Sequence, residues 1–255
     1  MVISNIKRII VTISFPLSIC YGSYAQPDTT TFKFNFELRH RYEAWQGMNA
    51  RNYGDNSEDA IGQLNDRVLL QRVIAGFTYS PWSGITLSAH LQDARAFGWS
   101  LRHSEYPELF RVNAPNSDKY YVMNPNEQFL EINDAFMHYA TANKNFSVTL
   151  GRQKISFGDN RIFGPGSWGN TGRWTWDALR VNYRWNDHSV DVFAGGTKTH
   201  DPTRTSVPFT QTQFWGGGAY AHFTAPYGFK FEPFCAYKRP GSADYINTLD
   251  FNRYW

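Results

Sequence analysis

Basic side chains in several segments of this 255-residue chain lie at positions of one parity, so that within a segment they are separated by an even number of positions. The set on one parity is Lys33, Arg39, Arg41, Arg72, Arg180, Arg184, Lys230 and Lys238, with Arg152 and Arg161 near the end of one segment. Guanidinium groups bind carboxylates through paired hydrogen bonds, and a ring of them concentrates anions in a narrow pore. These residues are therefore candidates for a path along which anionic solutes move.

Acidic side chains accompany these cations. They are Glu37, Glu43, Glu131, Asp177, Asp191 and Glu232, and Glu37 and Asp177 belong to the predicted path. Mixed charge would let a polyanion move from one cation to the next without being held. The alternative is that the charges form cross-strand ion pairs that brace a wall, each worth roughly 0.2–1 kcal/mol.

The elements that carry these residues alternate between apolar and polar positions. From Thr31 to Glu43 the aromatic and aliphatic residues share one parity and the charged residues share the other, which predicts a strand with one apolar face. The pattern returns in Ile85–Gln92, Leu179–Trp185 and Phe229–Lys238, and more weakly near Arg67–Tyr79, Gln128–Ala140, Phe146–Ser156, Ser189–Gly196 and Phe214–Phe223. The sequence thus predicts nine strands of about the length that crosses a membrane.

One cation does not fit the alternation. Arg152 has the parity of Phe146, Val148 and Leu150, which would direct its side chain to the apolar face. We expect a β-bulge, or the exit of the strand into a polar boundary, at this position.

Short and long connections alternate along the chain. Residues 81–84, 141–145, 186–188 and 225–228 are short and rich in turn formers, whereas about 44–66, 96–127, 157–173 and 197–213 are long and polar. This asymmetry is typical of an outer-membrane β-barrel. A soluble exported carbohydrate-binding β-sandwich remains the alternative, because sandwich strands also alternate.

The N-terminus and the composition agree with a barrel. Lys7 and Arg8 precede an apolar run and Ser23-Tyr24-Ala25 follows it, which predicts a signal peptide over residues 1–25 and a barrel domain over 26–255. Acylation of Cys20 as a lipoprotein is an alternative, disfavoured by the bulk of Ile19. Without Lys7 and Arg8, 23 basic residues face 22 acidic ones, so the net charge of +1 gives no reason to expect nucleic acid as a partner. Aromatic residues make up 17% although the mean hydropathy is low, as in a barrel with aromatic girdles and a polar interior.

Nine strands are an odd number, whereas single-chain bacterial barrels have an even one. Either Tyr245 to Trp255 forms a tenth strand, or the sequence is the N-terminal part of a longer barrel, which we favour because the loop before it would be short. The one cysteine left in the mature chain, Cys235, is expected to be a small apolar strand residue.

Motifs for catalysis are absent, and we expect neither an enzyme nor a cofactor nor a metal. His90, His138 and His222 could serve as bases beside Asp or Ser, but isolated histidines of a barrel interior are usually structural. Trp168, Trp174 and Trp176 could stack on sugars, and anchoring in an aromatic girdle explains them equally well.

A family resemblance rests on four stretches: Leu150-Gly151-Arg152-Gln153, Phe157-Gly158-Asp159-Asn160-Arg161, Gly164 to Asn170 and Trp176 to Arg180. Their order and spacing resemble the alginate export family of outer-membrane porins, and Arg39-His40-Arg41-Tyr42-Glu43 supports this more loosely. The resemblance implies an antiparallel barrel of eighteen strands whose basic lumen conducts an acidic polysaccharide outward. This chain would supply about half of that wall.

The sequence therefore predicts an all-β transmembrane barrel in the cell outer membrane that passes anionic solutes or acidic polysaccharide. Its expected partners are outer-membrane lipid, the anionic solute and periplasmic export proteins. A general porin with weak selectivity is the nearest alternative.

Overall fold

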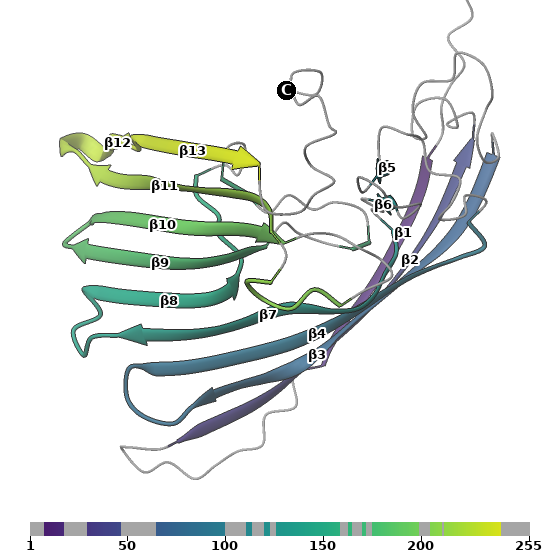
Figure 1. Cartoon of the computed structure of the whole chain (residues 1–255), viewed down its shortest axis with the longest axis horizontal. Coiled ribbons are helices and arrows are strands. Elements are labelled where there is room, and N and C mark those ends of the chain that lie inside the picture. Colours follow the sequence, from purple (N-terminus) through teal and green to yellow (C-terminus); the bar gives the residue numbers. More distant parts are fainter. Residues whose placement is uncertain are drawn as a thin grey trace, which may run out of the picture.

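Antiparallel strands form nearly all of the regular structure in the computed structural model, which describes residues 8–17, 30–46, 65–99, 111–113, 120–122, 126–158, 163–164, 170–171, 175–198, 205–210 and 212–240. Eleven strands form one sheet in the order β1-β2-β3-β4-β7-β8-β9-β10-β11-β12, with β13 also paired to β11 (Figure 1). Their bounds are β1 Arg8–Leu17, β2 Thr31–Gln46, β3 Asn65–Ser80, β4 Ile85–Phe97, β7 Gln128–Ala140, β8 Phe146–Gln153, β9 Trp176–Trp185, β10 His188–Lys198, β11 Thr212–Thr224, β12 Lys230–Phe231 and β13 Phe234–Pro240. Strands β5 (Arg111–Asn113) and β6 (Tyr120–Val122) form a separate hairpin, and η3 (Pro226–Gly228) is a single 3-10 turn.

The sheet curves into an open trough, with β1 at one edge and β12 and β13 at the other (Figure 1). Each strand pairs with the one before it in the sheet, so the chain runs up and down as in a barrel wall. No pairing within the described part of the chain joins β13 to β1, and the barrel is not closed. A two-layer sandwich is therefore the wrong alternative, because these strands form one continuous curved sheet.

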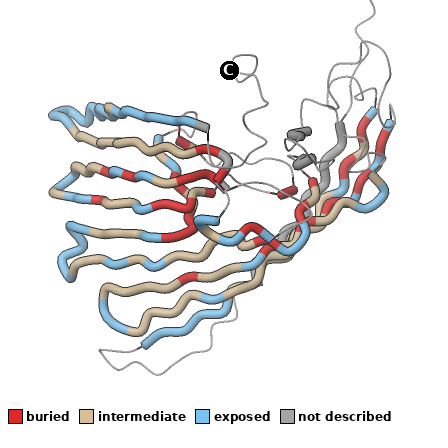
Figure 2. The backbone as a smooth tube through the Cα atoms, in the orientation of Figure 1, coloured by how far each residue is buried: buried red, intermediate tan, exposed pale blue. Residues whose placement is uncertain are grey.

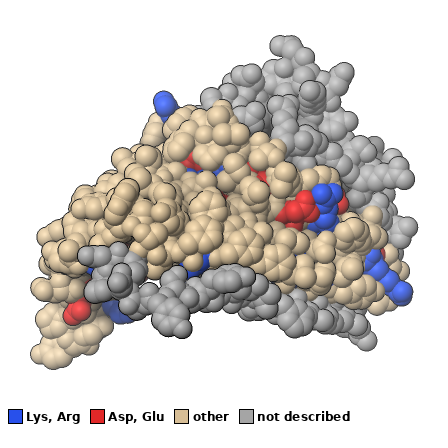
Figure 3. All heavy atoms as spheres, turned by 90° about the horizontal axis from the view of Figure 1, so that it is seen from below, with Lys and Arg blue, Asp and Glu red and all other residues tan. Residues whose placement is uncertain are grey.

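Alternation gives the trough two different faces. On β2, Phe32, Phe34 and Tyr42 lie on the outside and are 41–54% exposed. This convex face continues through Phe77 of β3 to Leu179 of β9, and Figure 3 shows few charged side chains on it. The concave face carries the opposite parity, including Lys33 to Glu43 of β2. Such a division suits a wall with lipid on one side and water on the other.

All nine predicted strands are confirmed, although several are longer than the alternation indicated. Strand β2 continues to Gln46 and β4 to Phe97. The last predicted strand, Phe229–Lys238, is interrupted between Phe231 and Phe234, so it appears as β12 and β13. The candidate tenth strand from Tyr245 to Trp255 lies outside the described residues.

The segment predicted as a signal peptide contributes a strand to the sheet. β1 pairs with β2 from Arg8 opposite Trp45 to Leu17 opposite Phe36. Residues 18–29, which contain the predicted cleavage position, are not described. The signal peptide over residues 1–25 stays a prediction.

No helix among the described residues is long and apolar enough to cross a membrane.

Candidate functional site

Three arginines lie together on the concave face of β2 and β3. Arg39 and Arg72 are directly opposite each other across the strand pair, and Arg41 is the next residue of that face. Two carboxylates accompany them: Arg72 Nη2 contacts Glu37 Oε1, and Arg41 Nε lies 2.7 Å from Glu43 Oε1. We call these five residues the arginine cluster. Counted over these five residues alone, it carries three positive and two negative groups, a net charge of +1.

A residue from the β8–β9 connection reaches this cluster across 131 positions of the chain. The Arg39 Nη2 group donates a hydrogen bond of 3.1 Å to Asn170 Oδ1. Asn170 is fully buried, and its Nδ2 lies 2.6–3.1 Å from the carbonyl oxygens of Gln71, Arg95 and Asn126. The next residue is held as well, because Gln92 Nε2 donates to the Thr171 carbonyl at 2.6 Å. This part of the connection therefore lies against the wall formed by β2, β3 and β4.

The beginning of the same connection packs on the opposite part of the trough. Phe157 stacks on Tyr220 with ring centroids 4.7 Å apart and planes 8° apart, and the edge of Phe163 meets both Phe157 and Phe193. The Phe157 N–H donates to the Phe163 carbonyl at 2.8 Å, which closes the segment on itself. These four aromatic residues, the aromatic platform, belong to the buried cluster of β9, β10 and β11. Figure 2 shows that buried positions gather at the ends of these strands next to the long connections.

A cation borders the platform. The Arg180 guanidinium carbon lies 5.1 Å from the centre of the Phe157 ring. The same guanidinium pairs with Asp191 at 2.7 Å, and Asn182 Nδ2 donates to the other oxygen of that carboxylate at 2.9 Å. Because Arg180 and Tyr220 both contact Phe157, the platform is a packed element of the wall.

A second charged group is completely buried. Arg152 binds Asp177 through two hydrogen bonds of 2.7 and 2.9 Å and Glu131 at 3.0 Å. It also donates to the carbonyl and the hydroxyl of Ser206 at 2.6 and 2.9 Å. The exposed fraction of the Arg152 and Glu131 side chains is 0%, and that of Asp177 is 3%. We call these four residues the buried ion network.

The buried ion network explains the parity of Arg152. The pairing of β8 with β9 is continuous, so Arg152 and Asp177 share the register of Leu150 and Leu179 on the convex face. Of the two expected explanations, the β-bulge is not found in β8, and the nearby register shifts are in the pairing of β4 with β7. The other explanation, a strand that leaves the apolar face, agrees with the end of β8 at Gln153, one residue after Arg152. Residues 205–210 of the β10–β11 connection cover the charges, with the Phe209 N–H donating to Asp177 at 2.9 Å.

A comparison with protein-family models identifies the family of the chain. The family model for alginate export matches residues 30–196, which is more than half of the chain. The chain belongs to the alginate export family. The match runs from the start of β2 into β10 and includes the arginine cluster, Asn170, Arg152 and Asp177. Neither a curated protein nor a solved structure matches the chain. Membership in this family indicates an outer-membrane channel.

In this alginate export family member, the structure brings together only part of the predicted path. Arg39, Arg41, Arg72 and Glu37 form one cluster on the concave face. Arg180 lies separately on β9, and Arg152 and Asp177 are buried under residues 205–210 rather than lining the concave face.

The other predicted residues have simpler surroundings. Lys33 and Arg184 are exposed, and neither has an ion pair within the part of the chain that the structure describes. Arg161, Trp168 and Trp174 lie outside the described residues. Trp176 packs its edge against Phe193, with centroids 5.2 Å apart.

One histidine superficially resembles a catalytic base. Ser88, His90 and Asp134 are mutually within 3.2 Å, but Ser88 and Asp134 both contact Nδ1 of His90. A serine relay needs the hydroxyl on one ring nitrogen and the carboxylate on the other. Here Nε2 faces Asn35 at 3.0 Å. Sequence reasoning had singled out His90 and could not foresee this geometry. No group of three potential metal ligands occurs in the described segments.

Proposed function

We propose that the concave face lines an outer-membrane channel for acidic polysaccharide or smaller anionic solutes. Family membership supports the channel, and the arginine cluster supports the preference for anions. Its three guanidinium groups exceed its two carboxylates by one positive charge. Oriented cations in a narrow water-filled path lower the energy of a passing anion.

The carboxylates of the cluster are part of the proposed function. Arg39 and Arg72 are like charges directly opposite each other, an arrangement that destabilises a strand pair. Glu37 and Glu43 offset this repulsion and leave the cluster weakly positive. A passing carboxylate can then exchange with an internal one, so binding is brief enough for conduction.

Two described parts of the β8–β9 connection, Phe157 and Asn170-Thr171, lie against opposite parts of the trough, and we infer that they narrow the path beside the arginine cluster. Asn170 and Thr171 are fixed to the wall at β2–β4, while Phe157 is fixed at β9–β11. Arg39 therefore lies where the connection meets the wall. We infer that the most selective part of the path is at Arg39 rather than at the exposed Lys33 or Arg184.

Reversal potentials of the full-length chain in planar bilayers under a KCl gradient test the proposal. The wild type should favour chloride, and Arg39→Gln combined with Arg41→Gln should shift the reversal potential toward cation selectivity, because the cluster changes from +1 to −1. Arg95→Gln is the matched control. Arg95 pairs with Asp93 at 2.7 Å and lies directly opposite Gln71 of β3, so its side chain is on the convex face, away from the proposed path. Equal reversal potentials in both variants and the wild type would overturn the assignment.

A second candidate is a general porin with weak selectivity. It is favoured by the pairing of Arg72 with Glu37 and of Arg180 with Asp191, because internally neutralised charges brace a wall more than they attract solutes. The two candidates differ toward polymers. An oligomer of uronic acids should block the current of an exporter-like channel at low concentration and leave that of a general porin unchanged.

We also propose that the chain is not an enzyme, because the Ser88, His90 and Asp134 geometry places no hydroxyl on Nε2 of the histidine. Hydrolysis of a chromogenic ester by the wild type, lost in Ser88→Ala, would contradict this.

A further inference from the structure

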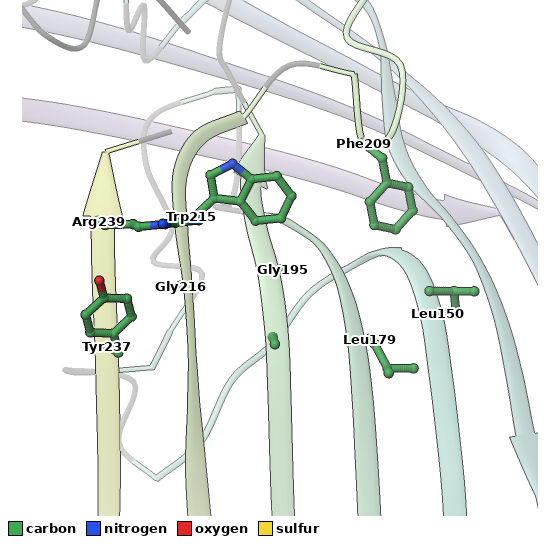
Figure 4. Close-up of a pocket in the computed structure, with 9 residues that line it drawn as sticks. Leu150, Leu179, Gly195, Phe209, Trp215, Gly216, Tyr237 and Arg239 are labelled. Atoms are coloured by element: carbon green, nitrogen blue, oxygen red, sulfur yellow. The ribbon is translucent and has the colours of Figure 1, made fainter. Parts of the chain in front are cut away.

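A groove of about 410 Å³ lies on the convex face, over β8 to β11 and β13 (Figure 4). Its floor is Ala194 of β10 together with the backbone of Gly195 and Gly216, so no large side chain fills it. Leu150 and Leu179, each about half exposed, continue the groove along the sheet. The hollow is therefore a consequence of small residues in a face that is elsewhere covered by large apolar ones.

Three aromatic residues form the walls. Trp215 comes from β11, Tyr237 from β13 and Phe209 from the β10–β11 connection (Figure 4). Tyr237 is 68% exposed and Phe209 is 47% exposed, so both present apolar surface that nothing in the described chain covers.

The buried ion network fixes the Phe209 wall. The Phe209 N–H donates to Asp177, and Ser206 is bound by Arg152 in the same segment. The segment also closes a turn, with the Thr210 N–H donating to the Val207 carbonyl at 3.2 Å. Because hydrogen bonds from Arg152 to Ser206 and from the Phe209 N–H to Asp177 fix this segment, the groove is preformed.

The groove has one charged lining residue, Arg239. It pairs in register with Trp215 near the end of β13, away from the short turn at Pro226–Gly228 and toward the long connections. Arg239 is exposed and has no ion pair with any described residue. A cation beside aromatic rings at the rim of an apolar face matches the depth at which lipid phosphates lie.

We propose that this groove binds one acyl chain of a phosphate-bearing membrane lipid, with the phosphate at Arg239. The apolar lining fits a hydrocarbon chain, the convex face is the one that faces lipid, and the positive charge lies at the end where the headgroup emerges. The hydrogen-bonding side chains of the lining are limited to Trp215, Tyr237 and Arg239, and the floor and the remaining walls are apolar, which suits a hydrocarbon chain better than a soluble polysaccharide. The proposal concerns the face opposite to the solute path, so it stands or fails separately from anion conduction.

Native mass spectrometry of the full-length chain in detergent micelles tests the site, with phosphatidylglycerol as the probe. The wild type should retain one lipid at the lowest concentrations. Ala194→Phe fills the floor and should weaken retention about tenfold, because several buried methylene groups are displaced. Val192→Phe is the matched control, since Val192 is 51% exposed on the same strand and face but does not line the groove.

A second comparison isolates the headgroup. Diacylglycerol has the same chains without the phosphate, and the wild type should bind it more weakly than phosphatidylglycerol. Arg239→Gln should abolish that difference while leaving diacylglycerol binding unchanged. Circular dichroism checks that each variant is folded, and Ala194→Leu replaces Ala194→Phe if the latter is not. Equal lipid retention by the Ala194 and Val192 variants, or an unchanged preference in Arg239→Gln, would overturn the proposal.

Discussion

Replacing Arg152 with methionine should destabilise the chain more than the loss of an exposed arginine does. The variant leaves the carboxylates of Asp177 and Glu131 without their guanidinium, at exposed fractions of 3% and 0%. Losing one partner of a buried ion pair costs about 3–5 kcal/mol, because the remaining charge is neither hydrated nor paired. Ser206 would lose its two hydrogen bonds from Arg152 at the same time.

The free energy of unfolding in urea, measured in phospholipid vesicles by tryptophan fluorescence, gives this cost directly. Arg95→Met is the control, because the side chains of Arg95 and Asp93 are 42% and 29% exposed and their pair should contribute only about 0.2–1 kcal/mol. Adding Asp177→Asn and Glu131→Gln to Arg152→Met should recover part of the loss, since no unpaired charge then stays buried. If Arg152→Met costs no more than Arg95→Met, the network is hydrated and the reasoning is refuted.

Three further predictions concern the backbone and the β8–β9 connection. Gly151→Ala should lower the free energy of unfolding by about 1–3 kcal/mol or more, because φ is +123° and a Cβ would lie 2.3 Å from the Ala135 carbonyl oxygen. The control Gly228→Ala, at φ +79° in open space, should lower it by only about 1 kcal/mol, and equal urea midpoints of the two variants would contradict this. Asn170→Ala should lower the free energy of unfolding by about 1–3 kcal/mol and expose the β8–β9 connection to limited proteolysis, because the carbonyl groups that Asn170 binds lose their donor. An unchanged digestion pattern would show that Asn170 does not hold the connection in place. Phe157→Ala should lower the free energy of unfolding by about 3 kcal/mol and increase proteolysis of the β8–β9 connection, since Tyr220 loses its stacking partner. A loss below about 1 kcal/mol would mean that the aromatic platform is loosely packed.

The strands could be predicted because alternation is a local signal. In β2, each residue from Phe32 to Tyr42 reveals its face through its own type, and no distant partner is needed. The turns were predictable for the same reason, since Gly84 and Asn186 adopt positive φ at the short connections. Strand ends were less predictable, because the extensions of β2 and β4 place apolar residues, Trp45 and Ala94, at positions with the parity of the concave face, where they are buried and the alternation breaks down.

The positions of the connections could not be predicted. Asn170 binds Arg39 and Ser206 binds Arg152, at separations of 131 and 54 residues, and no pattern in either segment indicates its partner. The aromatic platform was missed because Phe157 and Phe163 lie in a stretch interpreted as a polar outer loop. Arg152 did give a signal: a cation at an apolar parity requires buried partners, and Asp177 and Glu131 meet that requirement.

The central claim is that the concave face is a water-filled conducting surface and the convex face is not. Thr78 and Phe77 are neighbours on β3 that point to opposite faces. In a chain whose own cysteines are replaced by alanine, Thr78→Cys should react during current recording with a water-soluble, negatively charged thiol reagent, and chloride conductance should fall. Phe77→Cys should not respond. A response from Phe77→Cys with none from Thr78→Cys, or equal responses from both, would contradict the claim.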